Sequence, residues 1–169
     1  MQKLSEIKKW EIAEFLFIAI AGTLLHFVYE WTGQNPAAAI FAPVNESTWE
    51  HLKLLFMPAL LFTLIQEIAI GGRYPSLVTE KGKAVLLGLG AIPVLFYTYS
   101  GILGKNVTWV DILIFYLAAA LYTWTSWRNL EQEQGRGNGS LGAAIFVLLF
   151  LCFLVFTIRP PGIGLFISP

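Results

Sequence analysis

The chain has 169 residues, of which 56% are hydrophobic and only 13% are charged, and its mean hydropathy is +0.65. Soluble domains contain about 25% charged residues, so a water-soluble domain of this length would leave much apolar surface in water, whereas a lipid bilayer accommodates such surface. The formal net charge is +0 and no basic stripe is present, which argues against nucleic acid as a partner. The apolar composition makes membrane lipids the expected partners.

Five apolar segments have the length of about 20 residues that a membrane-spanning helix needs. In chain order they are residues 12–31, 50–70, 84–103, 109–127 and 141–159. The stretches between them hold much of the glycine, proline and charge, as connecting segments do. The sequence therefore predicts an all-α fold, a single domain over residues 1–169 made of five transmembrane helices.

The first segment is predicted to remain as a helix rather than to be a cleaved signal peptide. Glu11 and Glu14 interrupt its start, and no cleavage site of small residues follows it. Glu14 lies about one turn from the end of the span, and we interpret it as a surface anchor with Lys9 as its partner. At the other end, His26 and Glu30 are four residues apart and share one helix face.

The second segment opens with an unusually polar stretch, VNESTWEHLKLLF, at residues 44–56. Ser47 and Glu50 have the spacing of a capping box, in which each side chain accepts a hydrogen bond from the backbone N–H of the other residue. Helix capping does not account for the remaining polar residues, which are Asn45, Glu46, His51 and Lys53. They are either a solvated loop at the lipid headgroups or part of a site.

The chain ends with RPPGIGLFISP, at residues 159–169. Pro160 and Pro161 should end the fifth helix, because proline cannot continue a helical hydrogen-bond ladder. The residues that follow are too apolar for a free tail in water. We expect this segment to fold back over the bundle near the first or the second span.

The positive residues predict the orientation, because Lys and Arg are enriched on the cytoplasmic side. Eight of the eleven lie on one predicted face: Lys3, Lys8, Lys9, Arg73, Lys81, Lys83, Arg128 and Arg136. The six tryptophans fall near predicted span ends, where this residue is enriched. The expected localisation is a cell membrane, with the N-terminus cytoplasmic and the C-terminus and the polar stretch outside.

These observations predict one candidate site at the outer ends of the first two spans. Glu50 and His51 are its candidate general bases. The binding candidates are His26, Glu30, Asn45, Glu46 and Lys53, and the candidate ligands of a divalent metal ion are His26, Glu30, Glu46 and His51. Histidine and carboxylate side chains bind Zn²⁺ or Mn²⁺.

Three functional hypotheses remain open, and the sequence does not decide whether the protein is an enzyme. In the first, the site carries out metal-assisted chemistry on a lipid or a lipid-linked substrate. In the second, the protein is a small transporter, channel or ligand-binding protein, for which five spans suggest a homo-oligomer. In the third, the polar stretch binds a partner subunit.

Three motifs carry a resemblance to a known family: HFVYEWTGQN, VNESTWEHLKLLF and the closing PPGIGLFISP. Together they resemble a family of small bacterial and archaeal membrane proteins of unknown function. Its signature is a NESTWEHLK-like core, here residues 45–53, followed by an end like PPxxPLFxDP. Gly164 and Ser168 depart from that end. The resemblance implies a prokaryotic membrane protein and no known activity.

Overall fold

The structure is a computed structural model that describes residues 2–132 and 138–168, with side chains from residue 6 onward. Arg136 and the side chain of Lys3, two of the positive charges used for the orientation, lie outside this part of the chain. The described residues contain helices and no strand. The predicted all-α class is therefore confirmed.

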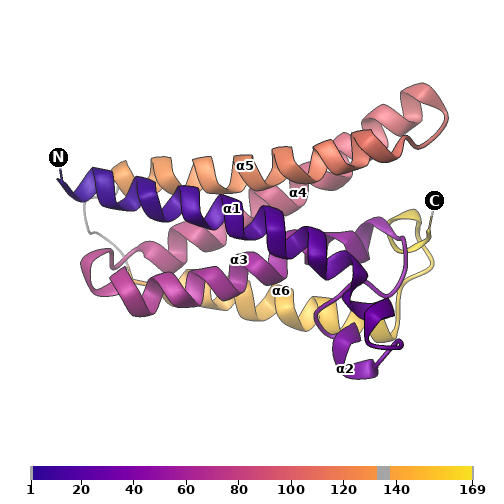
Figure 1. Cartoon of the computed structure of the whole chain (residues 1–169), viewed down its shortest axis with the longest axis horizontal. Coiled ribbons are helices and arrows are strands. Elements are labelled where there is room, and N and C mark those ends of the chain that lie inside the picture. Colours follow the sequence, from indigo (N-terminus) through magenta and orange to yellow (C-terminus); the bar gives the residue numbers. More distant parts are fainter. Residues whose placement is uncertain (1, 133–137, 169) are drawn as a thin grey trace.

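Five long helices form an elongated bundle, and a short helix lies at one end of it (Figure 1). In chain order the helices are α1 (Gln2–Trp31), α2 (Pro36–Ala39), α3 (Thr48–Ile70), α4 (Leu77–Leu103), α5 (Thr108–Gln132) and α6 (Ser140–Ile158). Two 3₁₀ turns are present, η1 (Gly71–Arg73) and η2 (Gly164–Phe166). The five long helices are all long and apolar enough to cross a membrane. This architecture is that expected of a multi-pass membrane protein.

Two helices begin well before their predicted spans. Helix α1 starts at Gln2 rather than near residue 12, and α4 starts at Leu77 rather than near residue 84. The added turns contain charged residues that are buried inside the bundle.

Glu14, which lies within the predicted first span, is fully buried, and its carboxylate accepts hydrogen bonds from the Lys81 ammonium and the Tyr122 hydroxyl. The interpretation of Glu14 as a surface anchor beside Lys9 is therefore wrong.

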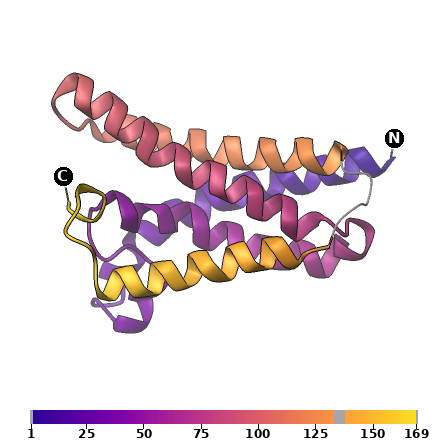
Figure 2. The same cartoon turned by 180° about the vertical axis from the view of Figure 1, so that it is seen from behind.

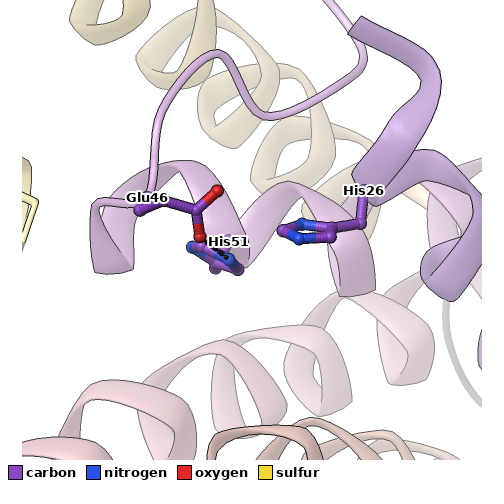
Figure 3. Close-up of side chains that lie close together, drawn as sticks. All are labelled: His26, Glu46 and His51. Atoms are coloured by element: carbon purple, nitrogen blue, oxygen red, sulfur yellow. Dashed lines mark ion pairs between the residues drawn. The ribbon is translucent and has the colours of Figure 1, made fainter. Parts of the chain in front are cut away.

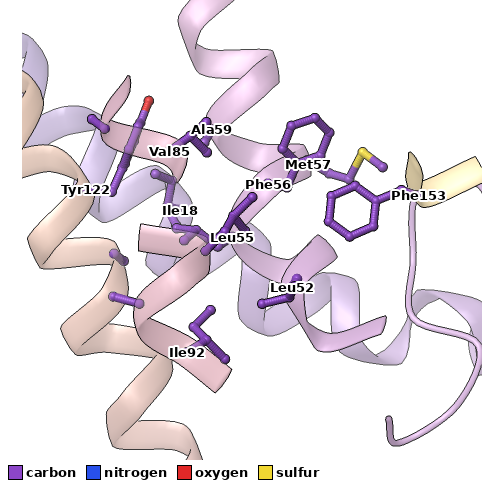
Figure 4. Close-up of a cluster of buried hydrophobic side chains, with 14 of the residues drawn as sticks. Ile18, Leu52, Leu55, Phe56, Met57, Ala59, Val85, Ile92, Tyr122 and Phe153 are labelled. Atoms are coloured by element: carbon purple, nitrogen blue, oxygen red, sulfur yellow. The ribbon is translucent and has the colours of Figure 1, made fainter. Parts of the chain in front are cut away.

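Helix α3 lies in the middle of the bundle and supplies much of its apolar core. Helix α1 packs against α3 and α5, while α4 packs against α3, α5 and α6 (Figures 1 and 2). The core includes Ile18, Leu55, Phe56, Val85 and Tyr122, which come from four different helices (Figure 4). Large apolar side chains also cover the outer surface of the bundle. A membrane-spanning bundle needs such a surface because it contacts lipid.

Helices α4 and α6 cross at a contact that only glycine permits. A Cβ atom at Gly142 would lie 1.9 Å from the Val78 carbonyl oxygen, and one at Gly82 would lie 2.8 Å from the Gly142 Cα. Small residues let helix backbones approach closely, which is how membrane helices gain packing energy without a hydrophobic driving force. This pair therefore fixes the position of α6 on α4.

Replacing Gly142 with alanine should destabilise the protein by about 1–3 kcal/mol, because the added methyl group overlaps backbone atoms that cannot move independently. Gly90→Ala is the matched control, since a Cβ at Gly90 meets no atom of the described residues within 4 Å. Thermal unfolding in detergent would measure both variants. Equal melting temperatures for the two would contradict the close contact.

The closing segment folds back onto the bundle, as the sequence predicts. The Phe166 ring lies 5.0 Å from the Trp49 ring at the start of α3 and 5.4 Å from the Phe156 ring on α6, measured between ring centroids. The turn η2 therefore packs on the second of the five spans. It lies at the same end of the bundle as α2 and the polar stretch (Figure 1).

Candidate functional site

The polar stretch at residues 44–56 forms the start of α3 and the loop just before it. Ser47 caps the helix, with the backbone N–H of Glu50 donating to its hydroxyl oxygen at 3.4 Å. The N–H of Ser47 donates to the Asn45 side chain at 2.9 Å, while the Glu50 carboxylate accepts from the N–H of Val44. Half of the predicted capping box is thus confirmed. The reciprocal half is wrong, because Asn45 takes that role.

Glu50 is occupied by a buried ion pair with Lys53. The Lys53 ammonium donates to Glu50 Oε2 at 2.7 Å and to the carbonyl oxygens of Ala39 at 2.9 Å and Ala42 at 3.4 Å. Thr157 on α6 donates its hydroxyl to Glu50 Oε1 at 2.7 Å. We call Lys53 and Glu50 the Lys53 pair. It fastens the loop that contains α2 to both α3 and α6.

Three other predicted residues converge beside this loop. His26 comes from α1, His51 from the first turn of α3, and Glu46 from the residues just before that helix (Figure 3). Their potential ligand atoms all lie within 4.8 Å of one another. The two imidazole rings are 5.2 Å apart between centroids. We call His26, Glu46 and His51 the histidine cluster.

The hydrogen bonding of His51 fixes which nitrogen faces the cluster. Its Nδ1 lies 3.0 Å from the Ser47 carbonyl oxygen. A carbonyl only accepts hydrogen bonds, so Nδ1 carries the hydrogen in this contact. In the neutral ring, Nε2 then offers a lone pair, and it lies 3.3 Å from Glu46 Oε2. Two acceptors at this distance repel unless a proton or a metal ion lies between them.

His26 supplies a second indication of a missing partner. Its Nδ1 is buried and has no hydrogen-bond partner among the described residues. A buried polar atom without a partner costs about 1–3 kcal/mol. A cation bound between the two histidines and Glu46 would offer this nitrogen a partner.

The dimensions of the histidine cluster fit a small divalent ion. Ligands bind Zn²⁺ at about 2.0–2.1 Å in a tetrahedral arrangement, which places neighbouring ligand atoms about 3.3 Å apart. The distance from His51 Nε2 to Glu46 Oε2 already has this value, 3.3 Å. Glu46 is 69% exposed at the side chain and His51 30%, so the carboxylate has room to adjust. Two histidines and a glutamate also form a common ligand set of catalytic zinc sites, which keep a fourth position open.

The histidine cluster borders a cavity of about 520 Å³ between α1, α3, α4 and α5. Apolar side chains form much of its wall, including Leu54, Ile92, Phe96 and Phe115. The polar side chains that line it include all three members of the histidine cluster together with Asn106 and Asp111. A ligand with an apolar part and a polar end fits such a wall.

The structure thus divides the predicted site residues into separate groups. It brings His26, Glu46 and His51 together. It places Glu50 and Lys53 in a buried ion pair that contacts the loop containing α2. Asn45 accepts a hydrogen bond from the backbone N–H of Ser47, the residue that caps α3, and Glu30 is exposed one turn beyond His26.

The fourth span also contributes to the site, which the polar stretch at residues 44–56 does not indicate. Asp111 and Asn106 line the cavity, and Asp111 accepts a hydrogen bond from the Tyr99 hydroxyl. The segment NVTWVD at residues 106–111 gives a signal, since it places an amide and a carboxylate at the start of a span.

Comparison with known proteins gives one match. The sequence model of a protein family described as a family of unknown function (DUF6512) matches residues 1–168. Neither the curated proteins nor the solved structures contain a match to the chain. The chemistry of the site therefore has to be inferred from its own residues.

Proposed function

The chain belongs to DUF6512, a family of unknown function. From the histidine cluster and the cavity beside it, we propose that the protein is a metal-dependent membrane hydrolase. In this proposal the histidine cluster binds one divalent cation, with Zn²⁺ the best fit. The substrate is an amphiphile, such as a lipid or a lipid-linked compound, whose apolar part occupies the cavity. The bond that is cleaved is an ester at the polar end.

The contact between His51 and Glu46 is the observation that carries the proposal. Its geometry directs a nitrogen lone pair at a carboxylate oxygen 3.3 Å away, with His26 next to both. A doubly protonated His51 would also relieve the repulsion. It would leave the buried Nδ1 of His26 without a partner, whereas a metal ion accounts for both features.

Each residue of the histidine cluster has a separate role in this proposal. His26 and His51 provide nitrogen ligands, and the hydrogen bond from His51 Nδ1 to Ser47 orients its ring, as outer hydrogen bonds orient metal ligands in general. Glu46 supplies a negative charge from a loop. The ion would polarise the ester oxygen and activate water for attack. Hydrolysis would join the hydroxide of this water to the acyl or phosphoryl centre, break that centre's bond to the ester oxygen, and leave the proton of the water on the departing alcohol.

Glu50 receives a structural role in this proposal rather than that of a general base. Both of its carboxylate oxygens already accept hydrogen bonds, from Lys53, Val44 and Thr157. It is also 2% exposed. A general base must reach the proton that it removes. The Lys53 pair instead holds the loop that positions Glu46.

The wall of the cavity supports an amphiphilic substrate. Its aromatic and aliphatic side chains would contact an acyl or prenyl chain, and its polar residues lie beside the histidine cluster. The distribution of Lys and Arg favours an orientation with this end outside the cytoplasm. The polar end of an outer-leaflet lipid would then reach the ion without crossing the membrane.

A channel or a transporter receives less support. Buried apolar side chains, including Ile18 and Leu55 (Figure 4), lie between the cavity and the buried charged residues toward the other end of the bundle. A polar path through the membrane would need polar side chains or water at these positions.

We expect the full-length protein in phosphatidylethanolamine–phosphatidylglycerol nanodiscs to bind one Zn²⁺ per chain and to release a lipid hydrolysis product. Elemental analysis would measure the metal, and mass spectrometry would identify the product as a cleaved acyl ester or phosphoester. Chelation and His51→Ala should both abolish product release. Glu67→Gln, which changes an exposed carboxylate on the far part of α3, should not. The proposal fails if no metal binds, or if the product forms equally without the metal.

A further inference from the structure

A second group of buried ionisable residues lies toward the other end of the bundle. Glu11 and Glu14 on α1 face Lys81 on α4 and Tyr122 and Ser126 on α5, and we call these five residues the Lys81 cluster. On α1, twelve residues separate Glu14 from His26, which corresponds to about 18 Å along a helix. The Lys81 cluster is therefore distinct from the histidine cluster.

Hydrogen bonds connect the members of the Lys81 cluster across three helices. The Lys81 ammonium donates to Glu11 Oε1 at 2.7 Å and to Glu14 Oε2. Tyr122 donates to Glu14 Oε1 at 2.7 Å, and Ser126 donates to Glu11 Oε1 at 3.2 Å. Each oxygen of Glu14 thus has a donor, as an ionised carboxylate requires.

The charges of the Lys81 cluster do not balance. Two carboxylates face one ammonium, and all three residues are at most 4% exposed. An uncompensated charge in a low-dielectric interior is strongly unfavourable. The cluster in this form carries one negative charge too many.

The helices packed around the cluster offer no second cation among their described residues. Helix α3 contributes Thr63, whose hydroxyl lies 3.4 Å from the Tyr122 hydroxyl, and this residue does not ionise. On α4, Lys83 pairs with Glu80 at 2.6 Å. On α1, Lys8 and Lys9 are exposed, and so is Arg128 on α5. Lys8 and Arg128 lie over the Trp127 and Trp124 rings, respectively.

Unpartnered polar atoms mark where a further charge would bind. Glu11 Oε2 and both polar side-chain atoms of Gln66 are buried, and none has a hydrogen-bond partner in the described part of the chain. Gln66 follows Thr63 by three residues, so it lies on the same face of α3. Helices α1 and α3 run in opposite directions (Figure 1), and Phe62 on α3 contacts Trp10 and Phe17 on α1. Gln66 follows Phe62 by one helical turn, which puts it near the level of Glu11.

We propose that the Lys81 cluster is a binding site for one monovalent positive charge, held at Glu11 Oε2 beside Gln66. The ligand is a proton or an alkali-metal ion, since either neutralises the cluster. A proton on Glu11 Oε2 would need one acceptor, which the Gln66 carbonyl oxygen provides. An alkali-metal ion would use the same two oxygens together with water.

The stability of the protein should depend on this ligand, because a ligand that binds only the folded state stabilises it. If the ligand is a proton, the folded protein holds a proton that an ionised, solvated glutamate lacks when the chain is unfolded. Stability then falls as the pH is raised. If it is an alkali-metal ion, stability rises with Na⁺ or K⁺ at constant ionic strength and is insensitive to choline.

Melting temperatures of the full-length protein in nanodiscs would test the proposal. One series varies the pH in choline chloride, another replaces choline by Na⁺ or K⁺ at fixed pH, and EDTA keeps the histidine cluster free of metal. We expect the wild type to respond in one series. Glu11→Gln should remove that response, because the remaining Glu14 and Lys81 balance each other. Glu67→Gln, the exposed control, should keep it.

Gln66→Leu gives a second measurement that leaves the charge unchanged. It should weaken the response, seen as a shift of its midpoint by at least about tenfold in ligand concentration, which corresponds to the loss of one hydrogen bond to a charged or polar ligand. It also keeps the test decisive if Glu11→Gln does not fold. A wild type that responds in neither series would overturn the proposal, as would a Glu11→Gln variant that keeps the full response.

Discussion

Replacing Lys53 with methionine will destabilise the protein by about 3–5 kcal/mol, because it leaves the Glu50 carboxylate buried without its counter-charge. Lys53 is 0% exposed and Glu50 is 2% exposed, so water cannot replace the lost contact. The carbonyl oxygens of Ala39 and Ala42 also lose their donor. The loop that contains Glu46 should loosen, and the metal affinity of the histidine cluster should fall with it.

The double variant Glu50→Gln/Lys53→Met separates the loss of a charge from the loss of packing. It removes both charges, and it should recover most of the stability that Lys53→Met loses, since isosteric replacement of a whole buried pair is often nearly neutral. Lys105→Met, at an exposed lysine, is the control for the loss of a positive charge. Thermal and denaturant unfolding in detergent would measure the series. Equal effects of Lys53→Met and Lys105→Met would show that the Lys53 pair contributes little.

Replacing His26 with alanine will lower the affinity for Zn²⁺ by more than about 100-fold, because even the loss of an outer partner of a metal ligand costs 10–100-fold. The same variant should leave the metal-free protein almost as stable as the wild type. The reason is that His26 Nδ1 has no hydrogen-bond partner among the described residues, so the loss is confined to the contacts of the ring with Phe27 and His51. A large loss of affinity with a small loss of stability distinguishes a ligand from a structural residue.

Competition with a chromophoric chelator would measure these affinities in nanodiscs. We expect His51→Ala to match His26→Ala in affinity and to lose more stability, because it also breaks the hydrogen bond to Ser47. Glu46→Gln should lose affinity through its charge alone. The prediction is wrong if His26→Ala binds Zn²⁺ like the wild type, or if its metal-free form melts far below the wild type.

The architecture was available from the sequence because it depends on local properties. A run of about 20 apolar residues is long enough for a span, whatever lies next to it. All five predicted segments lie within long helices of the structure or end one residue beyond them. The cap at Ser47, and the return of the chain after Pro160 and Pro161, also follow from residues close together in the sequence.

The composition of the sites was decided by the tertiary structure. The sequence predicts a single polar site at residues 26–53, but helix rotation turns Glu50 toward α6, Lys53 toward the loop that contains α2, and His51 toward α1. Lys81 and Glu14 are 67 residues apart and meet only because α4 reaches α1 inside the bundle.

The sites depend on the tertiary structure because a buried charge is tolerated only with a partner. Which residue becomes the partner depends on the depth and rotation of each helix. Packing contacts such as that of Gly142 with Val78 set these quantities, and they join residues far apart in the chain. The sequence by itself determined that this protein has five apolar helices and a polar stretch between the first two. The packing of those helices decided which polar residues share a cavity and which are paired in the interior.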